Sequence, residues 1–213
     1  MYPKFEAAGG FRGGLAPAAT GNKWGYVDVV GQFVLPPIWD AAQPFQENVA
    51  VVALDGRWGL TDRSGQTLVP PQFEFVPGLA EGAFFDGMAL ACQSGKYGFV
   101  SQLGLVAIEP MFDLAGDFGA GLALVEINGA YGYVDKTGRL AVMPKFEDAG
   151  VFSEGLAQVR TNGRWGYINP EGQTVIPATF DAAAPFRDGL AWVTEWGKWR
   201  YINPAGEVIW AEG

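Results

Sequence analysis

The stretch NGRWGYINPEGQTVIPATFD, residues 162–181, decides the fold because it places strand and turn signals in a fixed order. Asn162-Gly163 supplies two residues that tolerate positive φ, which is the strongest short-range signal for a β-hairpin. Trp165 to Ile168 then alternates aromatic residues with small or β-branched ones, as a strand does. Asn169 stands three residues before a glycine, a spacing typical of a type I turn. The stretch therefore predicts β-strands joined by tight turns.

The same order of features occurs six times, so the stretch is a repeating unit rather than a single site. Three sets of residues recur with spacings of 34, 39, 34, 34 and 34 residues: an aromatic residue at 24, 58, 97, 131, 165 and 199; a glycine at 31, 65, 104, 138, 172 and 206; and a phenylalanine at 11, 45, 84, 118, 152 and 186. Five extra residues between Phe73 and Phe84 account for the one longer spacing.

Each unit is predicted to be a three-stranded antiparallel meander. Its third strand is the Val-Ile-Pro segment, and proline removes a ladder donor, so this strand ends at the proline or lies at a sheet edge. The glycine that follows the Trp predicts a close approach by another group, and we expect an aromatic ring of the neighbouring unit there. The predicted units form one repeat domain over 1–213 and cover residues 3–36, 37–70, 71–109, 110–143, 144–177 and 178–211.

One such meander cannot bury both of its faces, so we expect stability to come from stacking on its neighbours. Two arrangements achieve this. A closed six-bladed ring, similar to a β-propeller, removes free edges, and the two ends of the chain together complete one unit. The alternative is an open β-solenoid with atypical end units. The ring is the preferred prediction for this all-β chain.

These motifs resemble the WG-repeat (KWG) family of bacterial proteins. The matching signature is G-[KR]-W-G-Y-[VI]-[DN]-x-x-G, nearly intact from Gly163 to Gly172 and recognisable in all six units. The chain departs from it at Tyr97, Tyr131 and Arg200, and in the first unit, where Asn22 replaces the turn glycine. The resemblance implies a β-rich repeat fold. It implies no agreed activity and no catalytic residues.

Composition restricts the function classes. The chain is 49% hydrophobic, which suits a folded core, and its net charge of −9 argues against nucleic-acid binding. The apolar run from Val49 to Leu54 is too short to cross a bilayer, so no membrane insertion is expected. No signal peptide is apparent, and cytoplasmic location is the default, although a processed secreted chain would look the same. The absence of histidine excludes His-based catalysis and His metal sites, so no enzyme, cofactor or metal is predicted.

An acidic residue follows the second aromatic residue of every unit. In a ring these carboxylates could hold a cation, but the preferred interpretation is that each one caps a turn. The series is Glu6, Asp40, Glu74, Asp113, Glu147 and Asp181.

Positions at which the units differ are the better candidates for binding. The last unit concentrates Trp192, Trp196, Arg200 and Trp210, and Trp and Arg dominate binding hot spots. Burial at a seam or end is the competing interpretation of these rings. The insertion is the other candidate, with Phe75 and Leu79, although it could also fold back onto the core.

The sequence therefore predicts a non-catalytic binding or scaffold module with a protein partner. A carbohydrate-binding module with exposed Trp platforms is the alternative, and a glycosidase-like enzyme acting through a carboxylate pair is a third.

Overall fold

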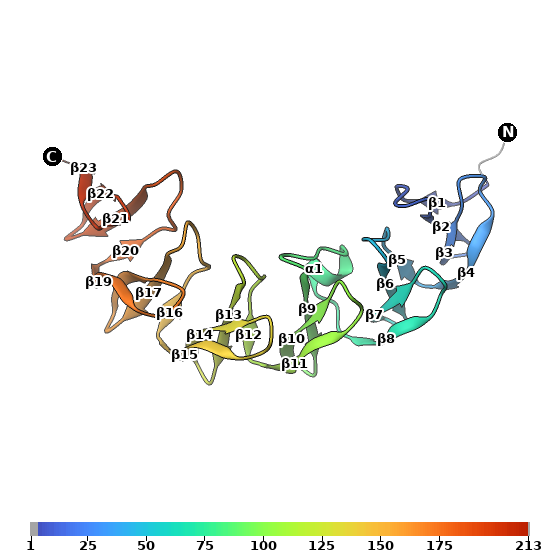
Figure 1. Cartoon of the computed structure of the whole chain (residues 1–213), viewed down its shortest axis with the longest axis horizontal. Helices are drawn as coiled ribbons and strands as arrows, with labels where there is room; N and C mark the ends of the chain where they lie inside the picture. Colours follow the sequence, from blue (N-terminus) through green and yellow to red (C-terminus); the bar gives the residue numbers. More distant parts are fainter. Residues whose placement is uncertain (1–3, 213) are drawn as a thin grey trace. The chain divides into compact units, whose positions relative to one another are not determined.

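A computed structural model describes residues 4–212 as a succession of small antiparallel sheets (Figure 1). The residues fall into two compact units, Met1–Met111 and Phe112–Gly213. Three predictions depend on how these two units are joined, and they stay predictions: a single repeat domain, a closed ring and an open solenoid. The two units are described separately below.

Unit 1 contains three sheets. The last residue of the third sheet, Phe112, already belongs to unit 2. Sheet 1 consists of β1 (Ala7–Ala8), β2 (Ala16–Thr20), β3 (Lys23–Val27) and β4 (Phe33–Trp39); sheet 2 of β5 (Ala41–Ala42), β6 (Val49–Leu54), β7 (Arg57–Asp62) and β8 (Thr67–Phe73); sheet 3 of β9 (Met88–Gln93), β10 (Lys96–Ser101) and β11 (Val106–Phe112). The insertion between sheets 2 and 3 forms helix α1 (Pro77–Ala80).

Unit 2 repeats the pattern with three four-stranded sheets. Sheet 4 consists of β12 (Leu114–Ala115), β13 (Leu122–Ile127), β14 (Ala130–Asp135) and β15 (Leu140–Phe146); sheet 5 of β16 (Asp148–Ala149), β17 (Ala157–Thr161), β18 (Arg164–Ile168) and β19 (Thr174–Phe180); sheet 6 of β20 (Ala182–Ala183), β21 (Ala191–Glu195), β22 (Lys198–Ile202) and β23 (Val208–Ala211).

The prediction of three strands per unit is wrong by one short strand. A two-residue strand begins each four-stranded sheet and pairs antiparallel with the first long strand, as Ala149 does with Val159. Sheet 3 has a single bridge, Glu74 to Cys92, in its place. The sheets are therefore shifted by a few residues from the predicted units. The third long strand also does not stop at its proline but continues to the aromatic residue, and it lies at the sheet edge as expected.

The glycine after the Trp serves a different purpose from the predicted one. In sheet 5, Trp165 pairs with Phe180 and Tyr167 with Ile176, so β19 bulges opposite Gly166. A Cβ on Gly166 would lie 2.5 Å from the carbonyl oxygen of Ile176. The group that approaches the glycine is thus the backbone of its own sheet, not a neighbour's ring. In sheet 6, Arg200 replaces this glycine and pairs regularly with Ala211, so no backbone crosses it.

The cores within each unit lie between consecutive sheets, which confirms the predicted stacking. We call the face with the Tyr of the second long strand the outer face. In unit 2, Tyr167 and Ile176 on the outer face of sheet 5 pack against Ala191 and Val193 of sheet 6. The fully buried Phe186 lies 4.9 Å from the Tyr167 ring, centroid to centroid. Burying one such side chain contributes about 1.5–3 kcal/mol.

Unit 1 uses the same device. Tyr26 and Trp39 of sheet 1 share a core with Phe45 and Val52 of sheet 2. The Tyr26 hydroxyl donates a hydrogen bond of 2.7 Å to the carbonyl oxygen of Gln43, and the Tyr167 hydroxyl donates one of 2.8 Å to that of Ala184. Desolvation raises the pKa of both tyrosines well above the ordinary value, so these hydroxyls remain donors.

Candidate binding surface on sheet 6

Sheet 6, whose strands β20 to β23 are drawn in orange and red in Figure 1, collects aromatic residues on its outer face. Tyr201 pairs with Trp192 on one side and with Trp210 on the other, and Trp199 pairs with Thr194, so these side chains share a face. The Trp192 and Trp199 ring centroids are 5.0 Å apart, and those of Tyr201 and Trp210 are 6.1 Å apart. The four rings form one continuous surface.

This surface is covered in the preceding sheet and open in sheet 6. Tyr167 is 0% exposed and Ile176 is 5% exposed, whereas the equivalent residues Tyr201 and Trp210 are 44% and 53% exposed. Within unit 2, none of the described sheets takes the place above sheet 6 that sheet 6 itself takes above sheet 5. The outer face of sheet 6 is therefore an exposed copy of a surface that the fold buries elsewhere.

A cavity of about 590 Å³ opens beside these rings, and we call it the sheet 6 socket. Pro185, Leu190, Trp192 and Tyr201 line it, together with Ala183, Ala184, Arg187 and Asp188. The lining residues come from β20, β21, the loop between these two strands, and Tyr201 of β22.

The equivalent place on sheet 5 shows what such a socket accepts. Leu156 and Tyr167, the counterparts of Leu190 and Tyr201, enclose Phe186 there. The Glu154 carboxylate then accepts hydrogen bonds from the backbone N–H groups of Asp188 and Gly189, at 2.7 and 3.0 Å. Asp188 is the counterpart of Glu154 in the sheet 6 socket. The socket thus combines an apolar recess with a carboxylate that can accept backbone N–H groups.

Trp196 lies apart from this face, at the tip of the β21–β22 hairpin. Its side chain is 78% exposed and its φ is +54°, a left-handed conformation that is strained for a bulky residue. The equivalent Asn128 and Asn162 tolerate this conformation better. The Arg164 guanidinium lies 5.4 Å from the centroid of the Trp196 ring.

Arg200 is not part of the aromatic surface. It pairs with Val193, on the opposite face from Tyr201, and its guanidinium forms an ion pair of 2.5 Å with Glu195. Neighbouring residues of a strand point to opposite faces, so Arg200 lies on the other side of sheet 6 from Trp192 and Trp210. Partner binding by Arg200 stays a prediction.

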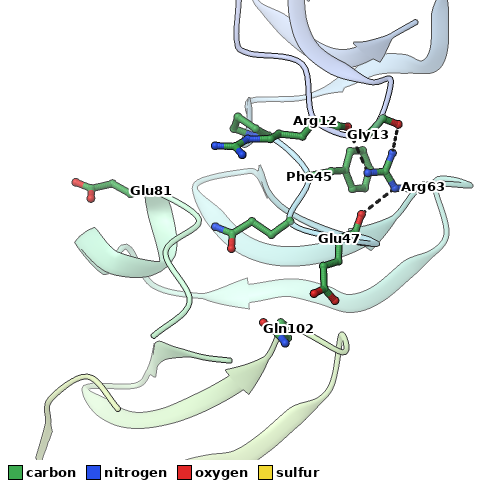
Figure 2. A pocket seen from close by; sticks show the side chains of 9 residues that line it. Arg12, Gly13, Phe45, Glu47, Arg63, Glu81 and Gln102 are labelled. Atoms are coloured by element: carbon green, nitrogen blue, oxygen red, sulfur yellow. Dashed lines mark hydrogen bonds between the residues drawn. The ribbon is translucent and has the colours of Figure 1, made fainter. Parts of the chain in front are cut away.

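The insertion is split between surface and core. Phe75 is 67% exposed, beside Trp58 at 6.3 Å between ring centroids, whereas Leu79 is fully buried between sheets 2 and 3. Leu79 is thus a core residue, and its prediction as a partner-binding residue is wrong. Just after α1, Glu81 lines a second cavity of about 610 Å³ in unit 1, with Arg12, Phe45, Arg63 and Gln102 (Figure 2).

Arg63 holds the backbone around this second cavity. Its guanidinium donates to the carbonyl oxygens of Gly13 at 2.9 Å and Arg12 at 3.3 Å, its Nε donates to that of Glu47 at 2.8 Å, and it lies over the Phe45 ring (Figure 2). Arg63 therefore ties the loop that contains Arg12 and Gly13 to sheet 2.

The repeated carboxylates bind the turns of their own sheets. The Asp40 carboxylate accepts hydrogen bonds from Lys23 of sheet 1 at 2.5 Å and from the Asp55 N–H at 2.6 Å, and these bonds lower its pKa. Equivalent bonds from a hairpin turn reach Glu6, Glu74, Asp113 and Glu147, and Asp181 pairs with Arg164. The turn-capping interpretation accounts for these contacts. Across residues 4–212, no group of three His, Cys, Asp or Glu side chains is placed to hold a metal ion. The cation site of a closed ring depends on how the two units are joined, so it stays a prediction.

Sequence reasoning missed Tyr201, Leu190 and Asp188 because they stand at repeat positions. Their exposure depends on what lies above them, which no local pattern records. In the described part of the chain, no helix has the length and hydropathy of a membrane span.

Comparisons with solved structures give distant similarities. Kluyveromyces lactis Hsv2p matches at 11% identity over 90% of this chain and 71% of its own, with a TM-score of 0.41. A Bacteroides caccae protein of unknown function matches at 16% identity over 96% of this chain and 92% of its own, with a TM-score of 0.31. Such similarity carries no conclusion about function. None of the curated proteins compared with the chain matches it.

The sequence profile of the WG containing repeat matches six consecutive segments, residues 2–24, 24–58, 58–97, 97–129, 131–165 and 165–199. These segments cover most of the chain and coincide with the spacing of the sheets. The chain belongs to the family of WG-repeat β-proteins.

Proposed function

We propose that this chain is a non-catalytic protein-binding module and that the sheet 6 socket, with its aromatic surround, is the docking surface. The observation that carries the proposal is the equivalence of the two sites: the socket that holds Phe186 on sheet 5 recurs, open, on sheet 6. A rigid and preformed recess loses little ordering entropy on binding. Trp and Tyr around it supply the contact area typical of hot spots.

The geometry also defines the partner's chemistry. A segment that binds like Phe186 presents a bulky apolar side chain, followed two and three residues later by backbone N–H groups that can donate to Asp188. A protein loop provides both. The pair of backbone N–H groups therefore favours a protein as the partner of the socket.

Photo-crosslinking tests this function. A benzophenone amino acid at Leu190, in the full chain incubated with a lysate of the source organism, should crosslink to a specific protein, to be identified by mass spectrometry. Tyr201→Arg should abolish that crosslink without changing the circular dichroism. A benzophenone at the exposed Val29 is the matched control. Crosslinks that are the same from both positions, or that survive Tyr201→Arg, would refute the socket as the docking surface.

A carbohydrate-binding function is the second candidate, and Trp196 is the observation that favours it. Its exposed ring at a hairpin tip, beside the Arg164–Asp181 ion pair, offers a stacking platform next to hydrogen-bonding groups. A glycan array should show binding that Trp196→Ala removes and Tyr201→Arg leaves intact. Binding that follows Tyr201 instead would assign the sugar to the socket.

The closed ring and the open β-solenoid stay predictions about how sheets 1–3 and sheets 4–6 are joined. Small-angle X-ray scattering of the intact chain separates them, because a closed ring of the same mass has the smaller radius of gyration.

A further inference from the structure

The loop of residues 11–15 in sheet 1 carries a side chain that fits the sheet 6 socket. Phe11 occupies the repeat position of Phe186, but it is 53% exposed, whereas Phe186 is fully buried. Phe11 is thus an exposed copy of the group that fills the socket on sheet 5.

The backbone of the 11–15 loop has the same conformation as the loop around Phe186 that binds sheet 5. Gly13 and Gly14 have φ values of +55° and +84°, and their counterparts Asp188 and Gly189 have values of +53° and +76°. The N–H groups of Asp188 and Gly189 are those that donate to Glu154. With Phe11 in the sheet 6 socket, the N–H groups of Gly13 and Gly14 would face the Asp188 carboxylate in the same way.

The loop is also held in place before any binding. Arg63 donates to the carbonyl oxygens of Arg12 and Gly13, so the backbone next to Phe11 is tied to sheet 2 (Figure 2). A fixed loop loses less conformational entropy on docking than a free one.

The sheet behind the loop matches as well. Ala16 and Ala18 of β2 are the counterparts of Ala191 and Val193, which pack on the outer face of sheet 5. Phe5 already packs against Ala16 and Ala18, as Phe180 does against Ala191 and Val193. Sheet 1 thus has the small side chains that an outer face accepts.

We infer that the Phe11 loop of one copy of this chain binds the sheet 6 socket of a second copy. The inference rests on the proposed function, since it names the partner of the same socket. The two surfaces are different, so the contact is heterologous and links copies head to tail. Such assembly grows with protein concentration until a ring closes or a filament forms.

Two one-sided variants test the inference. In Phe11→Asp the socket remains intact, and in Leu190→Asp the Phe11 loop remains intact. Sedimentation velocity of the purified full chain should show concentration-dependent oligomers for the native protein and monomers for each variant alone. An equimolar mixture of the two should form a 1:1 dimer that grows no further. Val29→Asp, at another exposed apolar position, should assemble as the native chain does.

The mixture keeps the test valid against misfolding, because two unfolded variants cannot restore a defined dimer. A native chain that remains monomeric at every concentration would overturn the inference, and so would variants that still assemble or a mixture that stays monomeric. If the native chain is monomeric while Leu190 still crosslinks to a different protein, the proposed function stands and only the second copy is wrong as partner. If neither result appears, both proposals fail.

Discussion

Gly166→Ala tests the physical reason for the Trp-Gly pair that defines this family. The added Cβ would lie 2.5 Å from the Ile176 carbonyl oxygen and 2.6 Å from the Ala178 nitrogen. Unstrained contacts of carbon lie at about 3.5 Å or more, so the β19 backbone must move by about 1 Å. The obstacle is backbone on both sides of a bulge, and no side-chain rotation relieves it.

The magnitude follows from what that movement breaks. Two ladder hydrogen bonds beside the bulge contribute about 1 kcal/mol each. The overpacking adds about 2 kcal/mol. Alanine also restricts the unfolded chain, which favours folding by less than about 1 kcal/mol, so the clash dominates. We expect Gly166→Ala to lower the free energy of unfolding by about 3–4 kcal/mol, or the Tm by roughly 6–16 °C for a chain of this size.

Thermal unfolding followed by circular dichroism measures the effect. Gly119→Ala is the matched control in the same unit, because nothing lies within 4 Å of its added Cβ and its φ is not in the left-handed region. The control should unfold within about 1 kcal/mol of the native chain. If Gly166→Ala is as stable as Gly119→Ala, the crossing backbone is not the reason for this glycine.

Three further predictions concern the contacts between sheets. Tyr167→Phe removes a buried donor and leaves the Ala184 carbonyl oxygen unpaired, so we expect the free energy of unfolding, measured by urea denaturation, to fall by about 1–2 kcal/mol. Tyr201→Phe on the exposed face of sheet 6 should change this free energy by far less. Equal effects of the two substitutions would contradict the prediction. The pKa of Asp40 is lowered in the folded chain, so its contribution to stability is complete above the unfolded-state pKa of about 4 and disappears as pH falls through the folded-state pKa. Asp40→Asn should therefore make the Tm fall less steeply at acid pH than it does in the native chain. An unchanged acid dependence of the Tm would contradict this role of Asp40. Arg63→Lys keeps the positive charge but lacks the planar guanidinium that donates to three carbonyl groups at once. Hydrogen exchange of the backbone amides in the loop that contains Arg12 and Gly13 should therefore become at least severalfold faster. Unchanged protection of these amides would show that Arg63 does not hold the loop.

The repeat could be read from the sequence because its signals are local. Asn162-Gly163 needs only two residues to specify a hairpin, and φ values of +51° and +74° confirm that turn. The stacking of the units could be predicted because a sheet of 34 residues has two faces and is too small to bury them by itself, so a neighbouring unit has to cover one of the two faces. Phe186, predicted as a repeated ring, lies at that contact.

The errors concern features without a sequence period. A two-residue strand such as Ala182–Ala183 is too short for any alternation to appear, so the fourth strand was missed. The partner of Gly166 was misidentified because a bulge depends on the pairing of two strands, and register is invisible in either strand alone. For Leu79 the sequence leaves surface and core both open, because a variable segment can fold either way, and only the structure shows that this side chain is buried.

The sequence by itself determined the unit, its turns and the rings that must be hidden, because hairpin chemistry and side-chain hydrophobicity act over a few residues. Only the tertiary structure decided which of those rings are hidden. Tyr167 and Tyr201 stand at the same repeat position, but sheet 6 covers Tyr167, whereas no sheet of unit 2 covers Tyr201. Burial is a property of the space around a side chain, so the open socket on sheet 6 became visible only once the sheets were placed on one another.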